Sequence, residues 1–176
     1  MAAIQNLCTR SILLDNGKVA KTGTVQQVVS HYLGLAKMSK VTFDNKPIKT
    51  AFVTQVQDRI ELLVEYEVDR KLKMPHLGFV FSDYLGNPIC GSSPKIEGLG
   101  NVTTPKNTGT IKVILHYPKL LNGTYRVSLW FGDGIDDFFQ AIDCLAFEVV
   151  NMTSLKQPHS FSVVGSVSPK CEWIFD

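Results

Sequence analysis

Along most of this sequence, apolar side chains recur at every second position. The clearest run covers residues 60–68, where isoleucine, leucine, valine and tyrosine alternate mainly with glutamate. A period of two places alternate side chains on opposite faces of a β-strand, and a strand with one apolar face is typical of antiparallel sheets. The pattern therefore predicts a half-buried antiparallel strand.

The same alternation predicts further strands, separated by turn residues such as Gly86-Asn87 and Asn122-Gly123. They lie at residues 77–81, 89–90, 111–115, 125–131 and 145–149, with a last short strand at 171–175. About six to eight short strands with turns between them are typical of an all-β antiparallel sandwich of the immunoglobulin-like or jelly-roll kind. A linker at residues 35–47 is expected to enter the first of these strands.

The N-terminal part has a different period. Thr24 and Gln27 form a capping box, in which each side chain satisfies a free backbone N–H of the other residue at a helix start. Apolar residues then follow at helical spacing, which predicts a helix over 24–33, and Gly34 is placed to cap its C-terminus. Before this helix, Asn16-Gly17 separates two short apolar runs and predicts a β-hairpin.

This hairpin and helix cannot enclose a core of their own, because isolated hairpins and short helices are marginal in water. We therefore expect residues 1–34 to belong against a domain that the sequence does not contain. In its absence the segment is expected to be poorly ordered, or exchanged between chains.

Charge and composition restrict the partners. Eighteen Lys and Arg against 16 Asp and Glu give a formal charge of +2. This is too little to hold nucleic acid or an anionic membrane by electrostatic attraction alone. The sequence contains no apolar run long enough to span a bilayer and does not begin with a signal peptide, so a cytoplasmic protein with a neutral partner is expected.

Three features of the N-terminal segment occur together: the run Leu14-Asp15-Asn16-Gly17-Lys18, the triplet Thr22-Gly23-Thr24, and a helix that ends in Tyr32-Leu33. In this combination they resemble the end of an ABC-transporter nucleotide-binding domain. The Walker A loop, the signature motif, the Walker B carboxylates and the switch histidine of that family are missing from this sequence, and His31 is not that histidine. The resemblance implies a full-length parent ATPase that binds ATP and Mg²⁺, and no cofactor is predicted for these residues.

The remaining residues carry a second resemblance. The run Val64-Glu65-Tyr66-Glu67-Val68 and the turn Asn122-Gly123 leading to Tyr125 are similar to the C-terminal domain of Wzt-type ATPases of O-polysaccharide export. Two parts are therefore predicted: residues 1–34 as the end of a nucleotide-binding domain, and residues 35–176 as a β-sandwich carbohydrate-binding domain.

Membership of that family implies a specific function and location. The domain would bind the non-reducing, often chemically capped, end of a lipid-linked O-polysaccharide (O-antigen) and select it for export. Its parent would bind the transmembrane permease subunit at the cytoplasmic face of the inner membrane. A homodimer, with strands exchanged between chains, is implied as well.

A candidate site follows from one strand. Arg126, Ser128 and Trp130 share its polar face, and sugars bind aromatic faces while planar polar groups take their hydroxyls. Alternatively, Trp130 covers a sheet edge or packs under the loop at 132–134. Further candidates on polar strand faces, which could equally be solvated surface, are Ser82, Lys112 and His116.

Two segments have more than one interpretation. Residues 91–110 either rim the site, with Asn101 and Asn107 as hydroxyl partners, or form a mobile loop. The aspartates at 133–137 do not match a calcium loop. A tight turn with helix-capping aspartates is predicted there, followed by one helical turn at 138–142.

Catalysis is not predicted. The four histidines lie in unrelated contexts, and no serine sits in a nucleophile elbow. The main alternative to sugar binding is a dimerisation or regulatory module of the ATPase that binds no glycan. Leu63, Val80 and Ile114 on nominally polar faces would then form an intermolecular patch.

Overall fold

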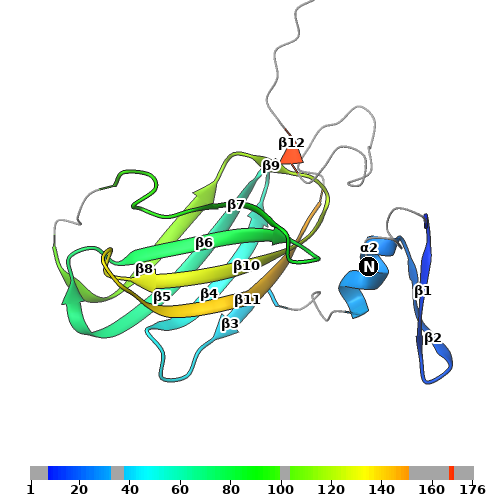
Figure 1. Cartoon of the computed structure of the whole chain (residues 1–176), viewed down its shortest axis with the longest axis horizontal. Helices are drawn as coiled ribbons and strands as arrows, with labels where there is room; N and C mark the ends of the chain where they lie inside the picture. The colour runs from blue at the N-terminus through cyan, green and yellow to red at the C-terminus, as the bar shows by residue number, and fades with distance from the viewer. Residues whose placement is uncertain (1–7, 33–37, 100–103, 151–166, 169–176) are drawn as a thin grey trace, which may run out of the picture.

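Two four-stranded antiparallel sheets stack face to face, as the computed structural model in Figure 1 shows. The structure describes residues 8–32, 38–99, 104–150 and 167–168. In spatial order, the first sheet consists of β11 (Asp137–Val149), β10 (Gly123–Gly132), β6 (His76–Asp83) and β7 (Pro88–Ser92). The second consists of β3 (Lys40–Thr42), β4 (Ile48–Val56), β5 (Arg59–Leu72) and β8 (Lys106–Leu115). The predicted antiparallel β-sandwich is confirmed.

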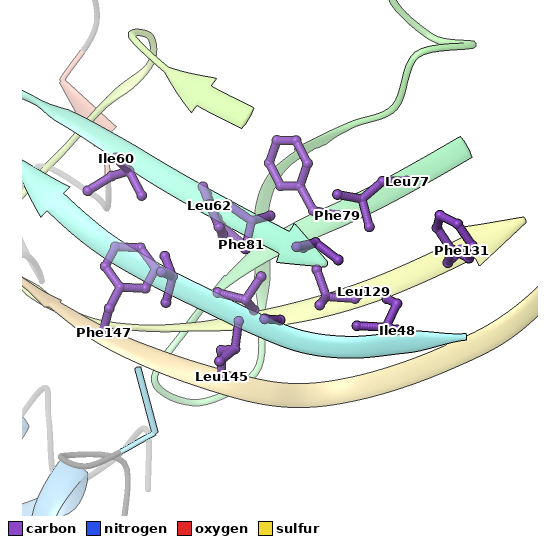
Figure 2. Close-up of a cluster of buried hydrophobic side chains, with 14 of the residues drawn as sticks. Ile48, Ile60, Leu62, Leu77, Phe79, Phe81, Leu129, Phe131, Leu145 and Phe147 are labelled. Atoms are coloured by element: carbon purple, nitrogen blue, oxygen red, sulfur yellow. The ribbon is translucent and has the colours of Figure 1, made fainter. Parts of the chain in front are cut away.

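The core lies between the two sheets, and the alternation read in the sequence builds it (Figure 2). Ile60 and Leu62 of β5 and Leu129 and Phe131 of β10 all point into this layer, and all four are at most 1% exposed. Tyr66 of β5 contacts Phe131 across it, with ring centroids 5.2 Å apart. At one end, the Tyr125 hydroxyl donates a hydrogen bond of 2.6 Å to the carbonyl of Leu121. The ring is therefore buried without loss of its polar partner.

The predicted helical turn at 138–142 is wrong, because these residues belong to β11. The register pairs Leu129 with Ala141 and Phe131 with Phe139, so the inward positions of β11 continue the core. A short apolar run has no periodicity that separates a strand from a helical turn.

The segment 91–110 is also shorter as a loop than predicted, because β8 begins at Lys106. Asn107 therefore lies on a strand of the second sheet, and Asn101 lies outside the described residues, as does the predicted strand at 171–175. The tight turn at Asp133 is confirmed. Its Oδ1 accepts hydrogen bonds from the N–H groups of Ile135 and Asp136, both at 2.9 Å, but the turn joins two strands and caps no helix.

The N-terminal elements form as predicted. Strands β1 (Ser11–Asp15) and β2 (Lys18–Gly23) pair around Asn16 and Gly17, whose positive φ angles fit a tight hairpin turn. Helix α2 (Val25–Tyr32) begins with the capping box. Thr24 N–H donates to Gln27 Oε1 at 3.1 Å and Gln27 N–H donates to Thr24 Oγ1 at 3.3 Å. No helix in the described part of the chain is long and apolar enough to cross a bilayer.

Helix α2 packs on the sandwich of its own chain, in contrast to the expectation from the sequence. Val25 and Val29 contact Tyr84, which follows β6, and Ala146 on β11. Ala146 is small and lies on the outer side of β11, so Val25 and Val29 can pack closely against the sheet there. The hairpin differs from the helix, because its apolar residues Ile12, Leu14 and Val19 are each more than 60% exposed.

Two short strands complete the described structure. Strand β9 (Lys119–Leu120) pairs with β12 (Val167–Ser168) in a separate two-stranded sheet.

Candidate functional site

The six residues predicted for sugar binding divide between two surfaces. Arg126, Ser128 and Trp130 share the outer face of β10, and Ser82 of β6 lies opposite Arg126 in the register. Lys112 lies on β8 of the second sheet, and His116 follows that strand. The six residues therefore cannot contribute to one site.

Arg126 and Ser128 form a polar cluster with Asp143 on the first sheet, and Ser82 lies beside this cluster. The Arg126 guanidinium donates from Nη1 to Asp143 Oδ2 at 2.7 Å and from Nη2 to the carbonyl of Tyr84 at 2.8 Å. Ser128 is 5% exposed, and its Oγ accepts a hydrogen bond of 2.9 Å from the Asp143 N–H. Ser82 is buried beside this cluster. The Nη atoms of Arg126 and the hydroxyl of Ser128 already have protein partners, which leaves little of them for a ligand, and the buried Arg126 Nε has no partner among the described residues.

A bulge in β11 brings Asp143 to this position. The register moves from Val127 opposite Leu145 to Leu129 opposite Ala141, so β11 has extra residues across from Ser128. Asp143 takes a φ of 49°, a left-handed conformation that Asp tolerates better than most residues. The bulge turns the carboxylate of Asp143 onto Arg126.

Trp130 lies apart from that cluster, in a cleft of about 540 Å³ on the same outer face. Strand β10 lies between β11 and β6, so Trp130 does not cover a sheet edge. Its neighbours across the ladder are Gln140 on β11 and Gly78 on β6, and the missing side chain of Gly78 leaves space on that side of Trp130. Residues at the end of β7 and in the following turn, among them Ser93 and Ile96, form the other wall of the cleft.

Close strand contact shapes the floor of this cleft. A Cβ at Gly91 would lie 2.5 Å from the carbonyl oxygen of Phe79, so only glycine fits where β7 approaches β6. The sequence analysis assigned no role to Gly78 or Gly91. The two-residue alternation in the sequence could have pointed to Gly78, because it places Gly78 and Val80 on the face of β6 opposite Phe79.

The walls of the cleft are mainly apolar, with a few polar groups. Val80, Pro88 and Ile96 contribute the apolar area, and His76, Ser92, Ser93 and Asp137 contribute polar groups. His76 is nine-tenths buried, and its Nδ1 has no hydrogen-bond partner among the described residues. Burial raises the pKa of the Cys90 thiol, which favours the protonated form over a nucleophilic thiolate.

A family model described as the Wzt C-terminal domain matches residues 33–167, most of the chain and nearly all of the sandwich. The chain belongs to the Wzt C-terminal domain family.

A solved structure agrees with this assignment in its fold. A crystal structure of the C-terminal domain of Wzt matches with a TM-score of 0.55 at 14% identity, over 80% of this chain and 89% of that one. OgpA from Akkermansia muciniphila matches with a TM-score of 0.35 at 16% identity, over 62% of this chain and 32% of its own. The second score is too low to support a comparison of folds. None of the curated proteins matches the sequence significantly.

A second cleft in this family member, of about 680 Å³, lies between the hairpin-helix segment and the sandwich. Several of its polar side chains already bond to one another or to the backbone. Thr24 and Gln27 form the capping box, and Gln55 bonds to both the N–H and the carbonyl of Val150 at 2.8 Å. This cleft also has no aromatic face comparable with Trp130, so it is the weaker candidate for sugars.

The outer face of the second sheet carries a ladder of charges. Glu61 lies between Arg59 and Lys112 and makes an ion pair of 2.8 Å with each. The Lys112 ammonium, which donates a hydrogen bond to Glu61, is the main cause that lowers the pKa of this carboxyl group. Among the described residues, no group of His, Cys, Asp and Glu side chains could hold a metal ion.

Proposed function

We propose that this domain binds the non-reducing terminus of a lipid-linked O-polysaccharide and so selects the finished chain for export by an ABC transporter. Membership of the Wzt C-terminal domain family supports the association with O-antigen export. The cleft around Trp130 supports the binding of a sugar.

The observation that carries the proposal is the position of Trp130 beside Gly78. On its β6 side the indole has no side chain opposite it, because the partner there is Gly78, and on its β11 side the partner is Gln140. The indole therefore offers an apolar surface over Gly78 to the C–H face of a sugar ring. His76 and Asp137 at the same cleft supply groups for hydroxyls. The volume of about 540 Å³ is that of a small-molecule site, which suits the end of a polysaccharide better than its whole length.

The hairpin-helix segment supports a link to a nucleotide-binding domain. Ile12, Leu14 and Val19 are exposed, and apolar side chains that gather on a hairpin are typical of a surface that another domain covers. In this proposal the parent ATPase binds ATP and Mg²⁺ with residues of its own and contacts the permease at the cytoplasmic face of the inner membrane.

Ligand-observed NMR tests the proposal directly. The protein is mixed with the surface polysaccharide of its source organism, either intact or with its non-reducing end trimmed. We expect saturation transfer to the intact glycan and its loss after trimming. Absence of transfer to both forms from a folded protein would contradict the proposal, and equal transfer to both would contradict recognition of the end.

The alternative, a dimerisation or regulatory module, is favoured by one observation. Phe52 and Ile114 are 38% and 41% exposed on the outer face of the second sheet, with Leu63 between their strands. Val80 lies instead on the first sheet, in the Trp130 cleft, so the predicted apolar patch is divided. Sedimentation velocity of the wild type and of Phe52→Ser tests this role: a dimer that the substitution dissociates would support it.

A further inference from the structure

We propose that the sugar recognised at the Trp130 cleft is uncharged and carries an apolar substituent, such as the methyl group of a 6-deoxy sugar, which enters a notch above Gly78. This inference rests on the proposed function, because it names the class of sugar that the same cleft would bind. It makes Gly78 a determinant of specificity.

Gly78 leaves a notch in the layer of side chains that lines the cleft. A Cβ built on Gly78 would lie 3.7 Å from the Cβ of Trp130 and 3.9 Å from the Cβ of Ser93, which are ordinary van der Waals distances. Between these two side chains the backbone of Gly78 is therefore bare, and an apolar group of a ligand can rest on it, further out than a bonded Cβ would lie. In the free protein nothing from Gly78 fills it.

The surroundings of the notch favour an apolar group there. Val80 is the next outward residue along β6, and Ile96 from the turn after β7 is 74% exposed beside the same cleft. Ser93 stands beside Gly78, but its hydroxyl already accepts a hydrogen bond of 3.3 Å from the Ile96 N–H. A sugar hydroxyl placed directly over Gly78 would therefore exchange its hydrogen bonds to water for few in the protein. A methyl group in the same place gains from burial, by roughly fourfold in affinity for one carbon.

The charges of the cleft disfavour an anionic sugar. Asp137 lines the cleft, and Glu97 stands at its rim, where it accepts a hydrogen bond from the hydroxyl of Ser92. Among the described residues that line the cleft, none is Lys or Arg. A uronic acid or a sugar phosphate would meet carboxylates there without a cation to balance them.

The test compares sugars that differ only at carbon 6, in two ring configurations. The galactose series consists of D-fucose, D-galactose and D-galacturonic acid, and the mannose series of D-rhamnose, D-mannose and D-mannuronic acid. Affinities are measured by saturation-transfer NMR titration against the wild-type protein. We expect the deoxy sugar of one series to bind about fourfold more tightly than its hydroxyl parent, and the uronic acid to bind least.

The variant Gly78→Ala fills the notch. Because Gly78 has no positive φ and its Cβ would meet no close atom, the fold should tolerate the change. We expect Gly78→Ala to weaken binding of the deoxy sugar and of the intact polysaccharide on the order of tenfold. Thr110→Ala, at an exposed position of β8 on the other sheet, is the matched control and should bind as the wild type does.

Two outcomes separate this inference from the function on which it rests. If the polysaccharide binds but the deoxy sugars show no advantage, or if Gly78→Ala binds it as tightly as the wild type with an unchanged melting temperature, the inference is overturned and sugar binding stands. If neither the polysaccharide nor any sugar binds to the folded protein, both fail. A second variant, Asp137→Asn, should narrow the gap between the uronic acid and the deoxy sugar, and an unchanged gap would contradict the role given to charge.

Discussion

The two sheets of the sandwich present opposite kinds of outer face. The second sheet is covered by a ladder of ion pairs whose cations reach solvent, such as those that Glu61 makes with Arg59 and Lys112. The first sheet is covered at one end by helix α2 and opens at the other into the cleft of Trp130, with the Arg126–Asp143 pair between them. Polar side chains at equivalent strand positions thus serve as solvated surface on one sheet and as structural support on the other.

The largest expected difference between the faces concerns stability. Asp143→Ala would leave the Arg126 guanidinium half-enclosed without its counter-charge, and a left-handed φ without the residue that tolerates it. We expect a loss of about 2–3 kcal/mol in the free energy of unfolding, measured by urea denaturation. Glu61→Ala on the second sheet should cost less, because the cations that it leaves behind, Arg59 and Lys112, are 36% and 49% exposed and stay hydrated, whereas Arg126 is 18% exposed. If the two variants lost equal free energy of unfolding, the proposed difference between the ion pairs of the two sheets would be wrong.

The next difference concerns ligand binding. Trp130→Ala should weaken binding of the polysaccharide by about 1–3 kcal/mol, the range for loss of an aromatic anchor or stacking surface. The matched control is Phe52→Ala, which removes an exposed aromatic side chain from the outer face of the second sheet. Its affinity for the glycan should equal that of the wild type. A loss of binding in Phe52→Ala alone would place the site on the second sheet.

A smaller effect is expected where α2 covers the first sheet. Val29→Ala removes two buried methyl groups from the contact with Tyr84 and Ala146, at a cost of about 1 kcal/mol to the docking of the helix. Hydrogen exchange should become faster in α2 while the amides of β10 and β5 keep their protection. Unchanged exchange in α2 would show that these contacts do not hold the helix.

The smallest effect is a dependence on pH. The hydrogen bond from Lys112 lowers the pKa of Glu61 from its ordinary value of 4.5. This pair therefore contributes stability above that value and loses the contribution as the pH falls through the lowered pKa. The difference in urea midpoint between the wild type and Lys112→Ala should shrink from pH 7 to pH 3. If the difference in urea midpoint instead grew as the pH fell, the Glu61–Lys112 pair would not lose its contribution on acidification, contrary to this prediction.

Period-two alternation was enough to predict which residues of β5 and β10 face the core, because burial of one face imposes that period. The same argument placed Arg126, Ser128 and Trp130 together on the other face. It could not show that Arg126 and Ser128 have protein partners, because Asp143 reaches them through a bulge with a positive φ. Such a bulge interrupts the periodicity on which sequence reasoning depends.

The docking of α2 could not be predicted for a related reason. An amphipathic stripe indicates that a helix covers something, without naming the surface. Nothing in the sequence distinguishes Ala146 from other small residues in strands. Only the folded sheet shows that it lies beside Tyr84 under the helix.

The wall of the Trp130 cleft that faces the indole comes from one continuous stretch of chain, from the end of β7 through Ile96. Strand β7 in this stretch pairs with β6 and not with β10, and helix α2 packs elsewhere, on Tyr84 and Ala146. Segments with those properties can be transplanted between homologous proteins without disturbing a scaffold. Under the proposed function, chimeras that exchange only this stretch would change which glycan is bound and leave the hairpin-helix segment as it is.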